Sequence, residues 1–312
     1  MKKTPTLFVL LPILIFTGFM GTMKPDFSFI NVKVQTAPSN FQTPGENPVC
    51  VDCHSDLIES KNVHKPASDS CGTCHAVDII DHSKNGARGL KLQKNVPALC
   101  FGCHKDIEEQ FKVLKNVHKA VNVSKSCNNC HSPHSSDEKK LLQEEQKRLC
   151  LSCHDKEVSA LGKKMINIKK LLETSKVIHP PAEKGCVVCH HPHGSTNNHN
   201  LISPFPTGNY APAVRDTFAL CWECHDSDLL EAEKTDAATN FRNGEQNLHF
   251  VHMNGKKSRS CVICHNVHAS ANEHLVEDKV KYGEWNLPIK YIPSAEGGSC
   301  FPGCHGIKTY AR

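Results

Sequence analysis

The chain has 312 residues, and 38% of them are hydrophobic when its 18 cysteines are counted among the hydrophobic residues. An ordinary soluble domain draws on nearly half of its residues for apolar side chains. The composition excludes a membrane-helix bundle and a coiled coil, and it argues against a doubly wound enzyme. The net charge is +5, and no basic stripe interleaved with aromatic residues indicates nucleic-acid binding. Something other than side chains must fill the interior.

The N-terminal sequence has the pattern of an export signal. Two lysines follow Met1, and an apolar run of 17 residues extends from Leu7 to Met23. This pattern predicts a signal peptide over residues 1–24, or an uncleaved N-terminal anchor, because the run is at the short limit for spanning a bilayer. Either interpretation places the rest of the chain outside the cytoplasm. Residues 25–49 are rich in Pro, Ser, Asn and Thr and predict a flexible spacer.

All 18 cysteines fall in nine pairs, and a histidine directly follows the second cysteine of each pair. Eight pairs have the spacing C-x-x-C-H, and the ninth has one residue more. The motifs are Cys50/Cys53/His54, Cys71/Cys74/His75, Cys100/Cys103/His104, Cys127/Cys130/His131, Cys150/Cys153/His154, Cys186/Cys189/His190, Cys221/Cys224/His225, Cys261/Cys264/His265 and Cys300/Cys304/His305.

C-x-x-C-H is the attachment signature of c-type haem. Each thiol forms a thioether with one haem vinyl group, and the next residue brings an imidazole to the iron as proximal ligand. Zinc ribbons need two cysteine pairs per metal, and nine is odd. A disulfide scaffold varies its spacings, and thioredoxin-like motifs come singly. We therefore predict about nine covalent haem c groups, or eight if the longer motif is not loaded.

The motifs recur in pairs, which divides the predicted cytochrome domain 50–312 into repeats 50–99, 100–149, 150–220 and 221–299 and a terminal motif 300–312. In each repeat a histidine behind a β-branched residue precedes the second motif. Another histidine follows that motif by three residues, except in the first repeat, where the gap is seven. These histidines are His64, His118, His179 and His252 before the motif, and His82, His134, His193 and His268 after it.

The segments HKAVNVSKSCNNCHSPH (118–134), HPPAEKGCVVCHHPH (179–193) and 252–268 carry a specific pattern. With them, residues 50–305 resemble the doubled-CxxCH multihaem c-type cytochromes. The resemblance implies bis-histidine haems packed in close pairs and a role as an electron carrier. The first repeat departs from the pattern because it lacks CHxxH, and the ninth motif departs through its extra residue.

Histidine numbers fit this pattern, since nine of the 21 are proximal and twelve remain for nine sixth-ligand positions. Eight fit the repeat, His249 and His274 are alternatives for the ninth motif, and His191 is an alternative to His193. His134 is too close to His131 to reach the far face of the same iron, so it must bind a neighbouring haem. The haems then form the core, and we predict a mainly α, haem-packed fold with much irregular structure and little or no sheet.

Local patterns predict few regular elements. Val158, Leu161, Met165, Ile168 and Leu172 have helical spacing, which predicts a helix over 156–174. Shorter helices are expected over 106–114, 137–149 and 228–238, and Pro-rich loops over 202–220 and 276–299. The tyrosines and tryptophans all follow residue 200, where they either cover haem faces or line a substrate pocket near the ninth motif: Tyr210, Trp222, Tyr282, Trp285, Tyr291 and Tyr310.

Two functions follow from these patterns. The first is electron transfer by mostly low-potential bis-histidine haems, since only Met165 and Met253 remain after the leader as alternative ligands. The second is a multihaem reductase of nitrite, hydroxylamine or a sulfur oxyanion, with one open haem near the C-terminus. Expected partners are other cytochromes, a membrane quinol dehydrogenase or an outer-membrane conduit, and an extracellular electron acceptor. The expected location is the periplasm, the outer membrane or the exterior, and the lysines are expected to pair with haem propionates.

Overall fold

The computed structural model describes residues 48–312 apart from 78–81, 83–88, 124 and 161–162. These residues belong to one compact unit, Ser39–Arg312. The predicted leader 1–24 and residues 25–47 of the predicted spacer lie outside the described residues. Residues 48 and 49 already belong to the first helix, so the predicted end of the spacer is two residues too late. Within the described ranges, no helix has the length and apolar character needed to cross a membrane.

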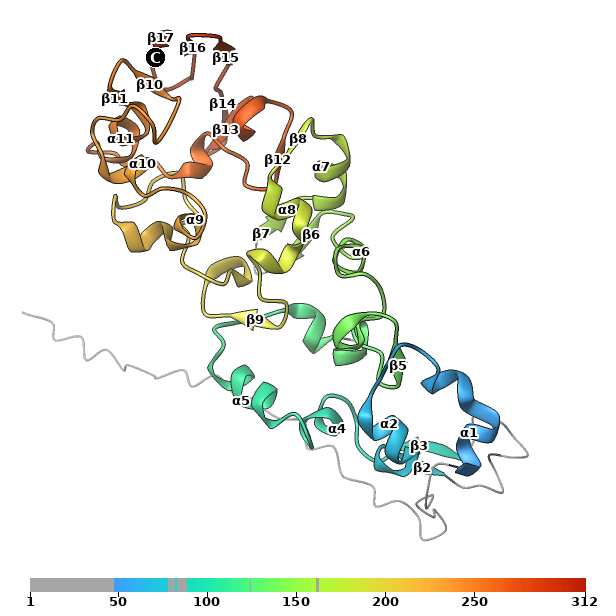
Figure 1. Cartoon of the computed structure of the whole chain (residues 1–312). Helices are drawn as coiled ribbons and strands as arrows, with labels where there is room; N and C mark the ends of the chain where they lie inside the picture. The colour runs from blue at the N-terminus through green and yellow to red at the C-terminus, as the bar shows by residue number, and fades with distance from the viewer. Residues whose placement is uncertain (1–47, 78–81, 83–88, 124, 161–162) are drawn as a thin grey trace, which may run out of the picture. The chain divides into compact units, whose positions relative to one another are not determined.

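The regular elements are short and follow one another closely along the chain (Figure 1). The described α-helices are α1 Pro48–His54, α2 Lys65–Asp69, α4 Ala98–Phe101, α5 Lys105–Val113, α6 Gln146–Leu151, α7 Ile168–Thr174, α8 Pro180–Lys184, α9 Ala219–Trp222, α10 Asp228–Glu231 and α11 Leu248–Met253. The 3-10 turns are η1 Ser55–Ile58, η2 Cys71–Thr73, η3 Lys119–Asn122, η4 Ser126–Asn129, η5 Lys139–Leu141, η6 Cys186–Val188, η7 Asn198–Asn200, η8 Arg215–Phe218, η9 Cys261–Ile263 and η10 Glu273–Leu275.

The strands form antiparallel pairs and one three-stranded sheet, β15–β16–β17. Their bounds are β1 Asn62–Val63, β2 His75–Val77, β3 Leu90–Leu92, β4 Asn116–Val117, β5 Ser135–Ser136, β6 Val158–Ala160, β7 Lys163–Met165, β8 Val177–Ile178, β9 Gly194–Ser195, β10 Arg242–Asn243, β11 Gln246–Asn247, β12 Ala269–Ser270, β13 Lys279–Tyr282, β14 Trp285–Pro288, β15 Tyr291–Ser294, β16 Gly297–Cys300 and β17 Lys308–Ala311.

Three of the two-residue ladders connect successive repeats. β1 pairs with β5, β4 with β9, and β8 with β12. In each ladder, the strand before the second motif of one repeat pairs with the strand after the second motif of the next repeat. Pairing of two strands fixes their register. Each ladder therefore also fixes the positions of the histidines that lie next to its two strands.

The two motifs of a repeat sit in different local structures. The first motif lies on or at the end of an α-helix, namely α1, α4, α6 or α9. The second motif begins on a 3-10 turn, namely η2, η4, η6 or η9. The two backbones present their cysteines differently, although the sequence spacing C-x-x-C is the same. This alternation recurs in all four repeats.

A tandem left-handed turn recurs in three repeats. Its positive-φ residues are Lys140–Leu141, His199–Asn200 and His274–Leu275. A serine closes each turn, because the hydroxyl of Ser195 donates to the carbonyl of Leu201 at 2.7 Å and that of Ser270 donates to the carbonyl of Val276 at 2.7 Å. Ser136 makes the equivalent bond to Leu142. Single non-glycine residues adopt this conformation only at a cost, so the surrounding hydrogen bonds must impose it.

Apolar side chains form only small cores in the described part of the chain. One cluster holds Ala211, Phe218, Leu230 and Met253, and another holds Ile263, Val276, Val280 and Ile289. Both lie in the C-terminal third. In the described part of the first two repeats the buried residues are small, namely Gly72, Ser126 and Ser136. Side chains therefore do not fill the interior of these repeats.

The predicted helix over 156–174 is wrong in its first half. Residues 158–160 and 163–165 form the β6–β7 hairpin, and the helix extends only over Ile168–Thr174. Asn167 sets this start, because its side-chain oxygen accepts the backbone N–H of Lys170 at 2.8 Å as an N-cap. The helices predicted over 137–149 and 228–238 are likewise limited to α6 and α10, which are shorter, whereas α5 agrees with the helix predicted over 106–114.

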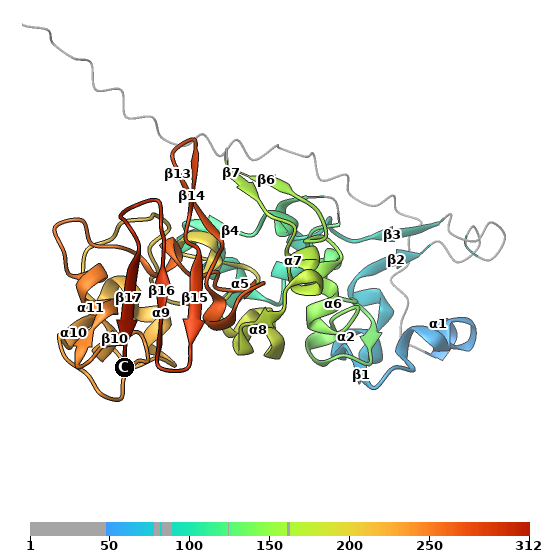
Figure 2. The same cartoon turned by 90° about the horizontal axis from the view of Figure 1, so that it is seen from above.

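The loop predicted over 276–299 is wrong as well. This segment forms the β13–β14 hairpin and the first two strands of the three-stranded sheet (Figure 2). The prolines that suggested a loop lie at tolerated positions, since Pro288 ends a hairpin strand and Pro293 lies on an edge strand. The predicted loop over 202–220 also contains η8, which begins at Arg215.

We expect Gly194→Ala to destabilise the protein, because its φ is +138° and a Cβ there would meet the Asn116 carbonyl and lie 2.9 Å from the Cα of Val117. Such strain costs about 1–3 kcal/mol and should lower the melting temperature by several degrees. Gly244→Ala is the matched control, since Gly244 also has positive φ (+55°) but nothing within 4 Å of its Cβ position. Equal melting temperatures for the two variants would contradict the expectation.

Candidate haem sites

The nine cysteine motifs line one connected cavity. We number them sites 1 to 9 in chain order, from Cys50/Cys53/His54 to Cys300/Cys304/His305. The cavity measures about 5580 Å³, and all 18 cysteines and all 21 histidines line it. Divided over nine sites, it provides about 620 Å³ each, which lies within the range of about 300–1,000 Å³ for cofactor pockets.

Each proximal imidazole faces one further imidazole across the cavity. The ring centroids of the nine facing pairs are 6.0–6.4 Å apart. In site order the pairs are His54–His82, His75–His134, His104–His64, His131–His193, His154–His118, His190–His268, His225–His179, His265–His249 and His305–His252.

This separation fits a metal ion bound by both rings. Metal–nitrogen bonds of about 2.0 Å on each side, plus roughly 1.1 Å from each nitrogen to its ring centre, place the two centroids about 6.2 Å apart. The residues present therefore fit a haem iron held between two histidines. Among the described residues, no group of three or more His, Cys, Asp and Glu side chains converges as a bare metal-ion site would.

The facing partner usually comes from the neighbouring repeat. A histidine that precedes a second motif reaches forward, so that His64 faces site 3, His118 site 5, His179 site 7 and His252 site 9. A histidine that follows a second motif reaches back, so that His134 faces site 2, His193 site 4 and His268 site 6. Two neighbouring repeats thus exchange imidazoles in both directions.

At two sites the facing histidine comes from the same repeat and not from a neighbouring one. At site 1, His82 of the same repeat faces His54. At site 8, His249 of the same repeat faces His265. His249 and His252 lie three residues apart on α11, on one face of the helix.

A buried asparagine holds α11 in place. Asn247 is fully buried, and its side-chain oxygen accepts the backbone N–H groups of His249 and Phe250 at 3.0 and 3.3 Å. Its amide group donates to the carbonyls of Asp228 and Ala232. This N-cap ties the helix that carries two facing histidines to the segment around α10.

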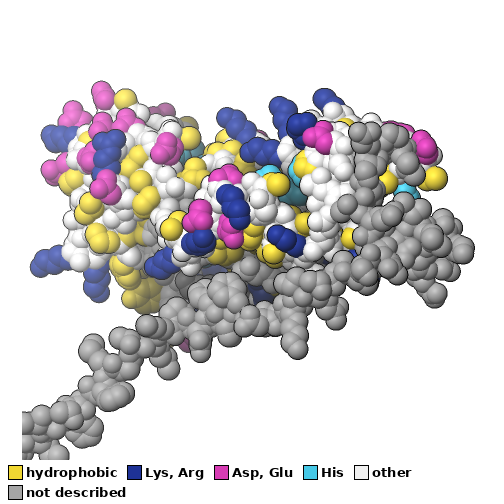
Figure 3. All heavy atoms as spheres, turned by 90° about the horizontal axis from the view of Figure 1, so that it is seen from below, with side chains coloured by type: hydrophobic (Ala, Val, Ile, Leu, Met, Phe, Trp, Pro, Cys, Tyr) yellow, Lys and Arg dark blue, Asp and Glu magenta, His cyan; other side chains and the backbone are white. Residues whose placement is uncertain are grey.

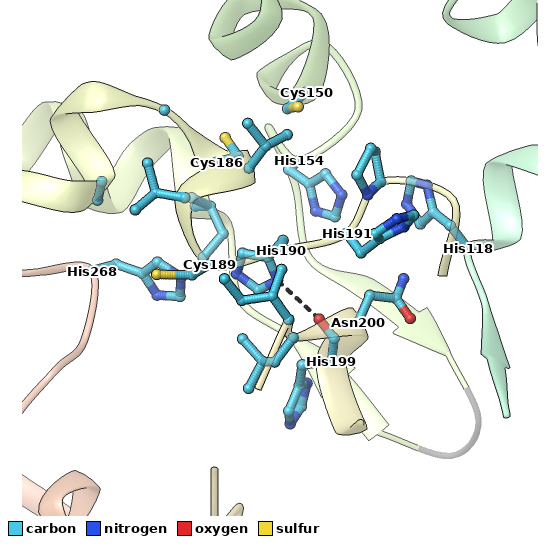
Figure 4. A pocket seen from close by; sticks show the side chains of 18 of the residues that line it. His118, Cys150, His154, Cys186, Cys189, His190, His191, His199, Asn200 and His268 are labelled. Carbon is cyan, nitrogen blue, oxygen red and sulfur yellow. Dashed lines mark hydrogen bonds between the residues drawn. The ribbon is translucent and has the colours of Figure 1, made fainter. Parts of the chain in front are cut away.

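The left-handed turns orient the proximal rings of three second motifs. The Nδ1–H of His131 donates to the carbonyl of Lys140 at 2.8 Å, that of His190 to His199 at 2.9 Å (Figure 4), and that of His265 to His274 at 2.8 Å. A carbonyl only accepts, so Nδ1 carries the proton and Nε2 keeps a free lone pair. Metal-binding histidines characteristically donate their other N–H in this way.

The forward-reaching histidines are held by the next repeat. The backbone N–H of His64 donates to the carbonyl of His134 at 2.7 Å, and its Nδ1–H donates to that of Pro133 at 2.9 Å. His179 makes the equivalent bonds to His268 and Val267, both at 2.9 Å. His118 bonds likewise to His193 and to Pro192. One repeat therefore positions both a ligand of its own and the ligand of its neighbour.

Burial keeps several of the facing imidazoles neutral. Together with a smaller effect of nearby histidines, it lowers the pKa of His249 to about 3 and the pKa of His268 to about 4. Burial also lowers the pKa of His265. A neutral imidazole retains the lone pair that binds a metal, whereas a protonated ring does not.

The cysteines show which sites adjoin. The first cysteines of paired motifs lie close to each other within each repeat, namely Cys50 to Cys71, Cys100 to Cys127, Cys150 to Cys186 (Figure 4) and Cys221 to Cys261. The second cysteines interact between repeats, namely Cys74 with Cys103, Cys130 with Cys153, Cys189 with Cys224 and Cys264 with both cysteines of site 9. Each site thus adjoins its neighbours in the sequence.

The structure separates the histidines that the sequence left as alternatives. His252, not His249 or His274, faces the ninth motif, whereas His249 faces site 8. The ring of His274 packs against Tyr291. His191 lies edge-on to His193, which is the ring that faces site 4.

Aromatic contacts at the C-terminal sites involve a residue that the sequence analysis did not single out. Phe241 lies 5.2 Å from His249, 5.8 Å from His252 and 5.2 Å from Tyr310, as ring-centroid distances. Of the aromatic residues that the sequence analysis singled out, Trp285 is 72% exposed at the β13–β14 turn and covers no site. No sequence pattern separates Phe241 from other surface phenylalanines.

Comparison with known proteins identifies the same cysteine motifs. The doubled CXXCH motif family matches residues 64–109, 118–159 and 179–229. These three segments belong to the doubled-CXXCH family of multihaem c-type cytochromes. The chain is 27% identical over 225 residues to the multiheme cytochrome MtrA of Shewanella baltica (strain OS185), which covers 65% of this chain and 59% of that protein.

The matched segments of this cytochrome contain complete facing pairs. Each begins at a forward-reaching histidine and ends just beyond the motif that this histidine faces, as with His64 and His104 in the first segment. The family unit is thus offset by half a repeat from the repeats 50–99, 100–149, 150–220 and 221–299. The matched CXXCH motifs indicate covalently bound haem c, for which the thiols and the histidine after each second cysteine are the residues that would hold the group.

Proposed function

We propose that this cytochrome is an electron-transfer protein that carries nine haem c groups, each bound by two histidines. The observation that carries the proposal is the set of nine facing imidazole pairs, which uses every proximal histidine once. When bound, haem iron supplies one-electron redox chemistry. The longer ninth motif is included, because His305 faces His252 like the other eight.

We further propose that electrons pass along the sites in sequence order. The cysteine contacts within and between repeats support this order, since each site adjoins the one before and the one after it. The polypeptide fixes the distance between the two imidazoles of each site, and burial lowers the pKa of histidines such as His249 and His268, so that they keep the lone pair that binds a metal. Two nitrogen ligands in place of a thioether sulfur favour low potentials.

The proposed partners are other redox proteins at the two ends of the site series, including cytochromes, a quinol dehydrogenase or an outer-membrane conduit. The proposed location is the periplasm, the outer membrane or the exterior, which the export signal in the sequence supports. Acidic and basic side chains are interspersed on the face shown in Figure 3. Such a mixed surface suits transient docking of proteins better than binding of nucleic acid.

Carbon monoxide tests this proposal directly, because it binds ferrous haem only where a coordination position is open. We expect no spectral change when carbon monoxide is added to the fully reduced protein, and mass spectrometry should give nine haems per chain. Binding to about one haem in nine would contradict the proposal and favour a reductase. The variant His252→Ala is the positive control, since it removes the imidazole opposite the ninth motif.

A further inference from the structure

We propose that three buried serines are positioning residues for the proximal histidines of sites 4, 6 and 8, and that they lower the reduction potential of these sites. The serines are Ser136, Ser195 and Ser270. The inference rests on the proposed function and deepens it, because it assigns the tuning of three haems to residues outside the ligand set. Each hydroxyl fastens the left-handed turn whose carbonyl accepts the Nδ1–H of one proximal ring.

The turn of the second repeat shows why it needs fastening. The Nδ1–H of His131 donates to the carbonyl of Lys140 at 2.8 Å. Lys140 and Leu141 have φ of +58° and +56°, a conformation that non-glycine residues adopt only at a cost. A backbone bond from the N–H of Ser132 to the carbonyl of Leu141, at 2.8 Å, ties one side of the turn to the motif. The other side must be held as well, or the turn relaxes and its carbonyl moves away from the ring.

The hydroxyl of Ser136 holds this other side. It donates to the carbonyl of Leu142, directly after the turn, and accepts the backbone N–H of Glu138 at 3.0 Å. Ser136 itself lies on β5, opposite Asn62 of the neighbouring repeat, and the Asn62 side-chain amide donates to the Ser136 carbonyl at 3.2 Å. The hydroxyl therefore connects the turn to the rigid ladder between two repeats.

The second repeat depends on its serine more than the next two repeats do. In these, a side-chain amide donates to the same carbonyl as the serine, at 3.0 Å from Asn197 and 3.1 Å from Asn272. The second repeat has Glu138 at this position, and an ionised carboxylate has no proton to donate. Within the described ranges, Ser136 is thus the only side-chain donor to the Leu142 carbonyl.

A firmly held acceptor changes the electronic character of the ring. A metal-binding histidine becomes more basic when its other N–H donates to a fixed carbonyl. The more basic ring stabilises the oxidised iron more than the reduced iron, and second-shell hydrogen bonding is one of the ways in which a protein sets haem potential. Loss of the serine hydroxyl should therefore weaken the bond and raise the potential of that one site.

The test uses the full-length, haem-loaded protein with His193→Ala, which should leave His131 as the only axial ligand of reduced site 4. In resonance Raman spectra, the iron–histidine stretching band of such a five-coordinate ferrous haem rises in frequency as the Nδ1–H bond strengthens. The band therefore reports on His131 alone among the nine proximal rings. Adding Ser136→Ala should move the band to lower frequency, and Ser136→Thr, which keeps a hydroxyl, should restore it.

Ser135→Ala is the matched control. Ser135 is the preceding residue of the same strand, and its hydroxyl also donates to a carbonyl, but to that of Leu57 at 2.7 Å and not to the turn. This variant should leave the band unchanged. Equal shifts in the Ser135 and Ser136 variants would assign the effect to the strand and overturn the proposal.

A second measurement keeps every ligand in place. In a spectroelectrochemical titration of Ser136→Ala alone, we expect about one ninth of the haem absorbance to take up its electron about threefold more favourably, a smaller effect than the roughly tenfold or more that follows loss of an outer-shell partner itself. An unchanged titration with nine haems present would overturn the proposal. If Ser136→Ala loses haem, the titration of Ser195→Ala decides, because the Asn197 amide still holds that turn. A His193→Ala variant that binds nine haems but no carbon monoxide would contradict the proposed ligands, and the titration would still decide the role of the serine.

Discussion

Replacing His193 by alanine should convert about one haem in nine to a high-spin form that binds carbon monoxide. His193 is the ring that faces His131, at a centroid distance of 6.1 Å. The cysteines and proximal histidine of site 4 remain, so covalent attachment should be complete. The measurement is the high-spin absorption of the oxidised protein together with carbon monoxide binding to the reduced protein, each normalised to total haem.

His191 provides a control only two residues away. Its ring lies 5.9 Å from that of His193, but it faces no proximal histidine. His191→Gln should therefore leave every haem low-spin. If His191→Gln opened a site and His193→Ala did not, the two histidines would have exchanged roles, and the assignment of site 4 would be wrong.

Replacing His249 by alanine should open site 8 and also destabilise the C-terminal part of the protein. The His249 ring is buried against Phe241 and faces His265 at 6.3 Å. Large-to-small changes at buried rings cost about 3–5 kcal/mol, in addition to the lost iron bond. We expect carbon monoxide to bind about one haem in nine and the melting temperature to fall by more than ten degrees.

The control for His249 is His274, the other histidine that the sequence left open for the ninth motif. His274→Asn keeps the backbone carbonyl that accepts the His265 Nδ1–H, and asparagine tolerates the positive φ of 56° at this position. This variant should keep all haems six-coordinate. An open haem in His274→Asn, with none in His249→Ala, would refute the assignment of site 8.

The sequence predicts which residue types form the sites better than it predicts which site each facing histidine serves. The spacing of the cysteines identifies the proximal histidines, and the repeat identifies the facing histidines. Spacing also excludes His134 as a partner of His131, because a separation of three residues is too short for the two rings to bind the same iron from opposite sides. The site that each facing histidine serves does not follow from spacing, since it depends on the β1–β5, β4–β9 and β8–β12 ladders.

Regular elements are harder to predict here, because apolar side chains form only small clusters in the described part of the chain and hydrophobic periodicity is therefore weak. Met165 and Ile168 continue a helical pattern, yet only Ile168 is in a helix. The turn residues Lys140, His199 and His274 have positive φ without the glycine that normally signals it. Hydrogen bonds to the proximal rings and buried serines impose this conformation, and neither has a local sequence signature.

The exchange of imidazoles between repeats also determines the order in which the sites can be completed as the chain folds from its N-terminus. His104, His154 and His225 find their partners upstream in the chain, whereas His75, His131 and His190 must wait for His134, His193 and His268, which follow them by 59, 62 and 78 residues. If the chain folds as it emerges from its N-terminus, each of these second-motif sites is completed only after the following repeat has emerged. Cutting it between any two of the four repeats would leave an unfinished site on each side, whereas residues 50–299 contain both imidazoles of sites 1–8, because His249 faces His265 within its own repeat.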